Sequence, residues 1–197
     1  MEISNYFARK TVEEPENVRW QPLEEHLQET AKLAEHFCGA FPWSKWAFTA
    51  GMCHDLGKYS DAFQRRIRGS NEQAVHSTAG AKAAAALLAR EGEFGKIAGR
   101  ILAYGIAGHH AGLPDGDSTS ESCLDYRLRH DSFPPLMYPA STLWKPELSI
   151  HDLESILSNR ANENDFAFGV SFFIRMLFSC LVDADRLNSE AFAEPGK

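Results

Sequence analysis

The sequence predicts an all-α protein that folds as a single domain of 197 residues. Apolar side chains recur three and four residues apart in several segments, which is the spacing of one face of an α-helix. Proline and glycine separate these segments, and no segment shows the apolar–polar alternation of a half-buried strand. The length suits one domain with a sizeable core. We therefore expect a bundle of helices without a β-sheet.

The first helix is expected to begin at Pro22, because proline fits the first position of a helix, where no N–H donor is needed. Before it, residues 1–20 are polar and read as an irregular arm. Pro42 should end this helix, and Gly57 is placed to stop the second one. Further helices are expected at residues 44–56, 60–68, 77–90, 95–109, 122–130, 149–159 and 165–187.

Residues 111–145 predict a long loop that contains the short helix at 122–130. Loops of this length inside a compact domain are often functional. Aromatic residues in this loop, Tyr126, Phe133 and Tyr138, could stack on nucleic-acid bases, although each could equally serve packing. The domain is expected to cover residues 21–190, and residues 191–197 read as a tail or the start of a linker.

The net charge of −7 argues against a simple nucleic-acid binder, because attraction to phosphates usually supplies much of the affinity. Bound divalent cations would add positive charge at the site itself. The basic run Lys58, Arg65, Arg66 and Arg68 could also form a local patch, or it could be only a solvated helix face. Both interpretations of this run stay open.

The chain is expected to work in the cytoplasm, without a membrane. Its four cysteines form no C-x-x-C pair, and residues 1–10 contain no apolar signal segment. The most apolar stretch, Phe166–Val182, is interrupted by Arg175 and is short for a bilayer span. We interpret it as a buried core helix.

Histidine and aspartate are the residues that could carry chemistry. His54 and Asp55 are adjacent near a helix end, and His109 and His110 are adjacent where a helix meets the long loop. Consecutive helical residues point about 100° apart, so such pairs chelate one metal, or serve two, only at a helix end. Mixed imidazole and carboxylate ligands suit transition metals. Two ions about 3.5–4 Å apart are an arrangement that hydrolyses phosphate esters.

The pattern as a whole resembles the HD superfamily of metal-dependent phosphohydrolases, and within it the HD nuclease of type I CRISPR systems. The resemblance spans Leu23 to Leu187. The motifs that carry it are L-E-E-H-L (23–27), G-M-C-H-D-L-G-K (51–58), A-F-Q (62–64), H-S-T-A-G-A (76–81), I-A-G-H-H-A-G-L-P-D (106–115) and L-V-D-A-D-R-L (181–187). It implies a helical HD bundle with a long active-site loop.

The resemblance also implies a ligand set for one or two divalent ions, with Mn, Fe, Ni or Co preferred to Mg or Zn. The first site would use His26, His54, Asp55 and a late aspartate, for which Asp185 fits the family pattern better than Asp183. The second site would share Asp55 as the bridge and add three further residues, namely His76, His109 and His110. His54 and Asp55 would be catalytic, together with Lys58, which could hold the scissile phosphate or only complement a helix end.

The implied function is a metal-dependent endo- or exonuclease that cleaves single-stranded DNA in CRISPR antiviral defence. A helicase domain or subunit and the RNA-guided surveillance complex would be its partners. The sequence contains no phosphate-binding G-x-x-x-x-G-K-[ST] loop, so it fits either a stand-alone nuclease or one domain of a helicase–nuclease. Two alternatives remain: a phosphohydrolase of cyclic dinucleotides or nucleoside triphosphates, and a non-catalytic helical interaction module.

Overall fold

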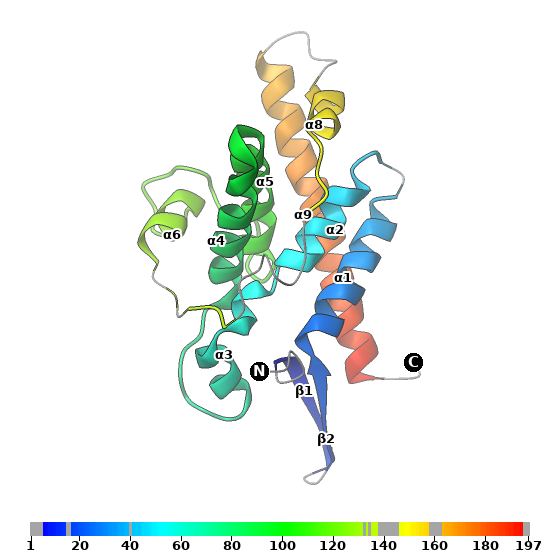
Figure 1. Cartoon of the computed structure of the whole chain (residues 1–197), viewed down its shortest axis with the longest axis vertical. Helices are drawn as coiled ribbons and strands as arrows, with labels where there is room; N and C mark the ends of the chain where they lie inside the picture. The colour runs from blue at the N-terminus through cyan, green and yellow to red at the C-terminus, as the bar shows by residue number, and fades with distance from the viewer. Residues whose placement is uncertain are drawn as a thin grey trace.

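The structure, a computed structural model, describes residues 6–14, 17–39, 41–131, 133, 135–137, 146–157 and 163–194. Tyr138 and the rest of the expected loop through residue 145 therefore lie outside the described residues, as do the ends of the expected arm and tail. Helices dominate the described part, which confirms the all-α class (Figure 1). The helices are α1 (Leu23–Phe37), α2 (Ser44–Cys53), α3 (Asp61–Ile67), α4 (His76–Leu88), α5 (Gly92–Gly108), α6 (Leu124–His130), α8 (Ile150–Leu157) and α9 (Glu163–Ala193), with 3-10 turns η2 (Leu56–Tyr59) and η3 (Ala89–Glu91).

The core lies where α1, α2 and α9 pack together and where α5 joins them. Trp46 of α2 is fully buried and meets Phe173 of α9 edge-to-face, with ring centroids 5.3 Å apart. Leu102 and Ile106 of α5 are buried in the same cluster. Burying each such aliphatic side chain contributes about 1.5–3 kcal/mol. Helix α5, from the middle of the chain, is thereby held against α2 and α9.

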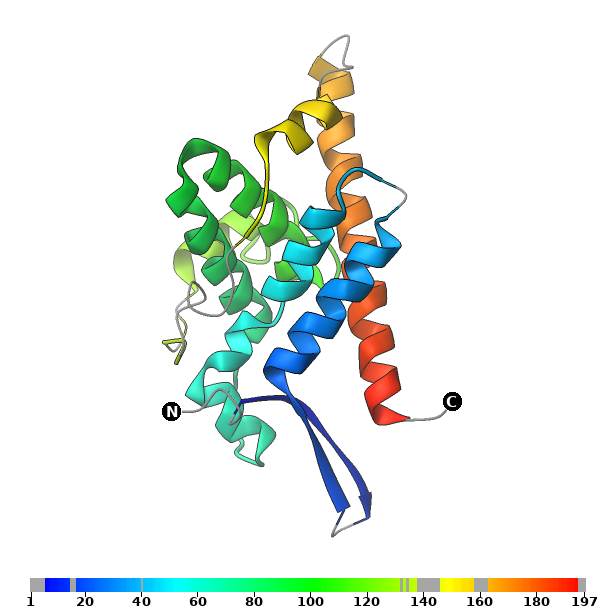
Figure 2. The ribbon, with the colours of Figure 1, turned by 45° about the vertical axis from the view of Figure 1, so that its right-hand side comes forward.

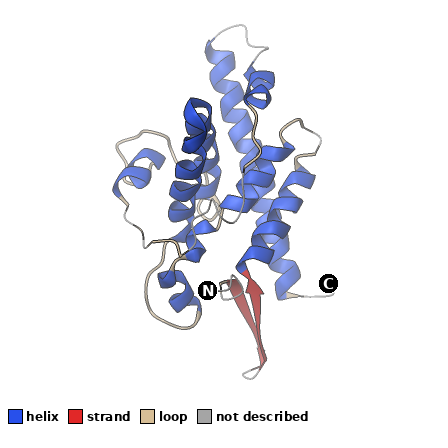
Figure 3. Cartoon of the chain, viewed as in Figure 1, coloured by secondary structure: helices blue, strands red, loops and turns tan. Residues whose placement is uncertain are grey.

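The prediction of an irregular arm over residues 1–20 is wrong in the described part, which forms a β-hairpin (Figure 3). Strand β1 (Phe7–Glu14) pairs antiparallel with strand β2 (Asn17–Pro22). The hairpin projects from the end of the bundle below α1 (Figure 2). Its base is held by tertiary hydrogen bonds: Leu23 N donates to Tyr6 O at 2.8 Å, and the Gln64 side chain exchanges two bonds with the Phe7 backbone. These contacts explain why a pair of strands is stable beside helices.

Several expected helix ends also differ. Helix α1 begins one residue after Pro22 and ends at Phe37, before Pro42, and α2 ends at Cys53, so Gly57 is not its stop. Gly57 lies within η2, where an added Cβ would be 2.2 Å from the carbonyl oxygen of His76. Glycine is therefore required there for close approach between η2 and α4, rather than for a helix cap.

Helix α9 is longer than expected and reaches Ala193, so part of the expected tail is helical. By length and composition, Asp165–Ala193 could cross a membrane, and the expectation that this stretch is too short is wrong. One face of the helix nevertheless packs in the core through Phe173, Leu177 and Leu181. A core helix of a soluble protein satisfies the same criterion, so length and composition alone carry no conclusion about a membrane.

Candidate metal centre

The His54–Asp55 pair lies at the exit of α2, where the backbone leaves the helix. His54 follows the last residue of α2, and Asp55 precedes the 3-10 turn η2. Helix α4 crosses close to this point, since an added Cβ on Gly80 would lie 2.7 Å from His54 O. Together with the approach at Gly57, this contact brings His76, the first residue of α4, to the same place. Two glycines thus permit the packing that gathers the site.

A first donor cluster consists of His26 from α1, His54 and Asp185 from α9. The Nε2 atoms of His26 and His54 lie 3.1 Å apart. Asp185 Oδ1 lies 3.4 Å from His26 Nε2 and 3.7 Å from His54 Nε2. Donor atoms at these separations can all reach one ion at the usual metal–nitrogen distance of about 2.0–2.1 Å. Asp183, the alternative, is exposed and lies outside the cluster.

A second donor cluster consists of Asp55, His76, His109 and His110. His76 Nε2 lies 2.9 Å from His110 Nε2, and Asp55 Oδ1 lies 3.3 Å from His76 Nε2 and 3.6 Å from His109 Nε2. His109 directly follows the last residue of α5 with helical backbone angles, and His110 lies in the turn after it, with the two ring centroids 3.9 Å apart. The structure therefore brings together all seven residues of the predicted ligand set.

Asp55 connects the two clusters. Its Oδ2 lies 3.1 Å from His26 Nε2 and 3.3 Å from His54 Nε2, whereas its Oδ1 faces His76 and His109. Its side chain is 1% exposed, so these neighbours, together with Lys58, replace water around the charge. One carboxylate oxygen is thus directed at each cluster, which is the geometry that a bridging ligand requires.

Hydrogen bonds orient two buried histidines. His54 Nδ1 donates to the backbone oxygen of Gly51, and His109 Nδ1 donates to that of Ile106, both at 2.7 Å. A carbonyl oxygen can only accept, so each ring carries a proton on Nδ1 and directs Nε2 at the clusters. Metal-binding histidines usually have such an outer partner, which orients the ring and raises its basicity.

His26 is oriented by a side-chain network that was not predicted from the sequence. Its Nδ1 donates to Asn188 Oδ1 at 2.7 Å, and Asn188 Oδ1 also accepts from Gln21 Nε2 at 2.8 Å. Asn188 Nδ2 donates to Glu29 at 2.6 Å, which settles the orientation of the amide. Asn188 is three residues after Asp185 on α9, so the helical period was the signal that could have revealed it.

Burial lowers the pKa of three of these histidines. Desolvation is the largest cause for His26, for His76, whose pKa falls to about 3, and for His110, whose pKa falls to about 4. Burial disfavours the charged imidazolium. These rings are consequently neutral near pH 7, the form that binds metals.

His54 behaves in the opposite way. Burial lowers its pKa, but the charge of Asp55 and hydrogen bonding to Asp185 outweigh burial and raise the pKa to about 10. The pKa values of the two carboxyl groups are held below their usual range: burial raises them, but the charges of Lys58 and His54 at Asp55, and hydrogen bonding to His54 at Asp185, have the larger combined effect. Both aspartates are therefore ionised, and an ion bound beside His54 would replace a proton.

Two cations contact the carboxylates. Lys58 Nζ lies 2.5 Å from Asp55 Oδ2 and is buried, so the predicted catalytic lysine does belong to the site. Arg9 of β1 was not predicted, and its Nη2 lies 3.2 Å from Asp185 Oδ1. Other residues of the predicted basic run contact groups outside the two clusters. Arg65 pairs with Glu72 at 2.9 Å, and Arg66 donates to the Ala74 backbone oxygen.

The donor set fits a metal site. In each cluster the ligand atoms lie within 4.8 Å of one another. Asp55 Oδ1 and His109 Nε2 are buried, and within the described part of the chain they have no hydrogen-bond partner. Burying an unsatisfied polar atom costs about 1–3 kcal/mol, so two such atoms facing each other indicate a ligand between them. A divalent ion held by Asp55, His76, His109 and His110 would satisfy both.

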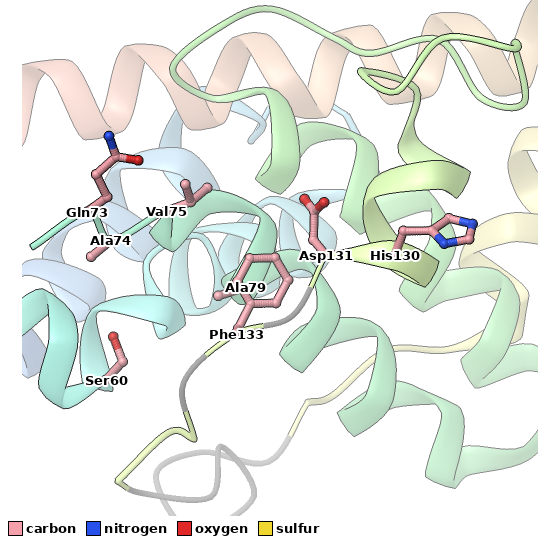
Figure 4. Close-up of a pocket in the computed structure, with 8 residues that line it drawn as sticks. All are labelled: Ser60, Gln73, Ala74, Val75, Ala79, His130, Asp131 and Phe133. Atoms are coloured by element: carbon pink, nitrogen blue, oxygen red, sulfur yellow. The ribbon is translucent and has the colours of Figure 1, made fainter.

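A cavity lies beside this centre rather than over it. Its volume is ≈ 490 Å³, and its lining comes from the segment before α4, the first turns of α4 and the end of α6 (Figure 4). Phe133 from the expected loop contributes to the lining, as does Ser60 after η2. None of the clustered histidines or aspartates lines it, so the cavity is distinct from the metal centre.

Comparison with known proteins agrees with this geometry. Residues 23–136, more than half of the chain, match the family model described as HD domain. The fold is similar to a solved structure described as the crystal structure of a CRISPR-associated protein, with a TM-score of 0.59 and 20% identity. The match covers 97% of this chain but 23% of that one, and a search of the curated proteins gives no match. The chain therefore belongs to the HD-domain family of metal-dependent phosphohydrolases.

Proposed function

We propose that this protein is a nuclease that hydrolyses phosphodiester bonds of single-stranded DNA in a CRISPR defence system. The observation that carries the proposal is Asp55, whose two oxygens face two separate donor clusters. A pair of divalent ions, when bound, supplies an activated water and stabilises charge on the phosphoryl oxygens. The imidazole-rich ligand set favours Mn, Fe, Ni or Co over Mg, which prefers oxygen ligands.

The chain's own residues would position the reaction. Asp55 sets the separation of the two sites, and the Nδ1 hydrogen bonds hold His26, His54 and His109 with Nε2 directed inward. Lys58 keeps the Asp55 charge compensated in a buried place and offers a cation near the phosphate. Such fixed charges need no reorganisation during the reaction, which is where electrostatic catalysis gains most.

The open side of the centre supports a polymeric substrate. His110 is exposed and His76 is partly exposed, whereas His26, His54 and Asp55 form a buried floor. A strand can pass across such a rim, while a small nucleotide would gain more from an enclosed pocket. The similarity to a CRISPR-associated protein supports the biological setting, a cytoplasmic one with a helicase and an RNA-guided complex as partners.

The test compares substrates under identical metal conditions. Purified protein is assayed with Mn²⁺, Ni²⁺, Co²⁺ and Fe²⁺ on linear single-stranded DNA, duplex DNA, cyclic dinucleotides and nucleoside triphosphates, with the His54→Ala, Asp55→Ala double variant as the control. We expect cleavage of single-stranded DNA that is lost in the variant. Rapid turnover of a small nucleotide without DNA cleavage would replace this proposal with the small-nucleotide alternative. If wild type binds no more metal than the double variant, the non-catalytic interpretation stands.

A further inference from the structure

Arg9 reaches the metal centre from a part of the fold that the HD motifs do not include. It lies on β1, and its Nη2 is 3.2 Å from Asp185 Oδ1 and 3.2 Å from His26 Nε2. The base of β1 is fixed by Gln64, which bonds both the Phe7 backbone and the carbonyl oxygen of Lys58. The hairpin therefore delivers a guanidinium group to the first donor cluster.

The guanidinium lies beside the predicted ion position and not in it. Arg9 Nη2 is 3.2 Å from His26 Nε2 and 3.4 Å from His26 Nδ1, nearly equal distances, which places it over the face of the ring. An ion about 2.1 Å from Nε2 along its lone pair would be roughly twice as far from Nδ1. Arg9 and an ion can therefore both be present, sharing Asp185 Oδ1.

Arg9 also lies on the solvent-accessible side of the first cluster. Its side chain is 22% exposed and that of Asp185 is 14% exposed, whereas the side chains of His26 and His54 are 0% exposed. Arg9 contacts Asp185 through Nη2, and its buried Nε has no acceptor among the described residues. The pair therefore lacks the two parallel bonds of a locked arginine–carboxylate fork, and the guanidinium can exchange this partner for a phosphate, which it binds in the same forked way.

Electrostatic repulsion favours the exchange of Asp185 for an anion as the partner of Arg9. Within the first cluster, Arg9 and an ion would both be attracted to Asp185 and would repel each other. A bound dication thus weakens the hold of Asp185 on Arg9 and favours an anion as its next partner. Under the proposed function, the phosphodiester of the substrate is the anion available to replace it.

We propose that Arg9 is a phosphate-binding residue of this metal centre: it leaves Asp185 for the substrate phosphodiester on the open side of the first cluster. The inference rests on the proposed function only in taking the substrate to be a phosphodiester. It requires opposite effects of removing Arg9, with tighter metal binding and weaker phosphodiester turnover. A purely structural role would weaken both.

The experiment uses Arg9→Ala and Arg9→Lys in the full chain, with Lys10→Ala as the matched control. Lys10 is the adjacent residue, is exposed and lies over the Trp20 ring, so its removal changes the net charge equally away from the centre. Mn²⁺ affinity is measured by calorimetry, and turnover is measured with bis(4-nitrophenyl) phosphate, a chromogenic phosphodiester, and with single-stranded DNA. Thermal unfolding midpoints check that each variant is folded.

We expect Arg9→Ala to bind Mn²⁺ about three- to ten-fold more tightly and to lose roughly ten- to a hundred-fold in kcat/KM on the chromogenic ester, the range for a charged hydrogen bond. Arg9→Lys should recover part of the turnover, and Lys10→Ala should resemble wild type. Weaker Mn²⁺ binding, or unchanged turnover, in Arg9→Ala overturns the inference. If wild type cleaves the ester but not DNA, the DNA assignment fails while the Arg9 comparison still decides this inference. If wild type cleaves neither substrate, unchanged or weaker Mn²⁺ binding in Arg9→Ala overturns the inference.

Discussion

The two donor clusters share Asp55 but are built differently. The first is assembled from both ends of the domain, since His26 lies on α1 and Asp185 on α9. Arg9 contacts Asp185, and Lys58 contacts the Asp55 oxygen that faces this cluster. The second uses the start of α4 and the end of α5, and its outermost member, His110, is exposed. The first cluster is thus the more enclosed and charge-compensated one, accessible beside Arg9 and Asp185, and the second is the more open one.

This difference indicates that the two clusters bind and exchange their ions differently. An enclosed site whose ligands are held by outer hydrogen bonds should bind its ion more tightly and exchange it more slowly. An open site with an exposed ligand should exchange its ion more readily and can accept a water or a substrate oxygen in a free position. We therefore expect two classes of metal site, the tighter one at His26, His54 and Asp185.

Replacing the shared ligand should have the largest effect. Asp55→Ala removes an oxygen from both clusters. Under the proposed two-ion function, we expect it to reduce phosphodiester hydrolysis by more than about a thousand-fold and to weaken both Mn²⁺ sites. Initial rates, Mn²⁺ titration and circular dichroism measure this outcome. Asp183→Ala, which removes an exposed carboxylate on α9, is the control. A rate near wild type would remove Asp55 from the mechanism, and loss of helicity would assign it a structural role.

Removing the outer partner of His26 should affect one cluster only. Asn188→Ala deletes the acceptor of the His26 Nδ1 proton, and losing such a partner typically lowers metal affinity by about 10–100-fold. The Mn²⁺ titration should then show one weakened class and one unchanged class. His110→Ala is the complementary variant, because it should weaken the open cluster instead. Equal weakening of both classes by either variant would contradict the division between the clusters.

The sequence and its family resemblance predicted much of this arrangement. Most of the helices were expected because local signals such as Pro22 and the helical spacing of apolar residues mark them, although several of their ends differ. The seven ligand candidates were expected because the H-D and H-H pairs resemble the HD pattern, and the structure brings them together, although metal binding by them stays a prediction. Asp185 was preferred to Asp183 for the same reason.

What the sequence could not predict depends on tertiary contacts. The β-hairpin was missed because its strands are polar and are held by Gln64 and by the end of α9, where Arg19 donates to Phe192 O at 2.7 Å. Gly57 was given the wrong role because the approach of α4 is not visible in the local sequence. Arg9 was missed for the same reason as the hairpin that carries it.

The number of protons released on Mn²⁺ binding should differ between the two clusters, and this effect should be of intermediate size. Because the pKa of His54 is raised to about 10, this ring is protonated at pH 7 and an ion at the first cluster must displace its proton. Apparent Mn²⁺ affinity there should rise by up to about ten-fold per pH unit between pH 7 and 9. His76 and His110 are already neutral, so the second cluster should change less. Calorimetry in buffers of different ionisation enthalpy, with Asn188→Ala and His110→Ala to separate the sites, counts the protons. Equal release at both clusters would contradict the assignment.

The smallest effect is expected from replacing Arg65. This variant tests whether the single-stranded DNA avoids α3. Arg65 is exposed on α3 and paired with Glu72, so its charge is already compensated at the surface. Exposed ion pairs contribute little and are screened by salt, so Arg65→Ala should change KM for single-stranded DNA by less than about two-fold at physiological ionic strength. Arg9→Ala is the comparison in the same assay. If Arg65→Ala raised KM as strongly as Arg9→Ala, the strand would follow α3 toward the centre. The basic run would then be a binding face, and Arg9 beside Asp185 would not be sufficient to explain substrate recognition.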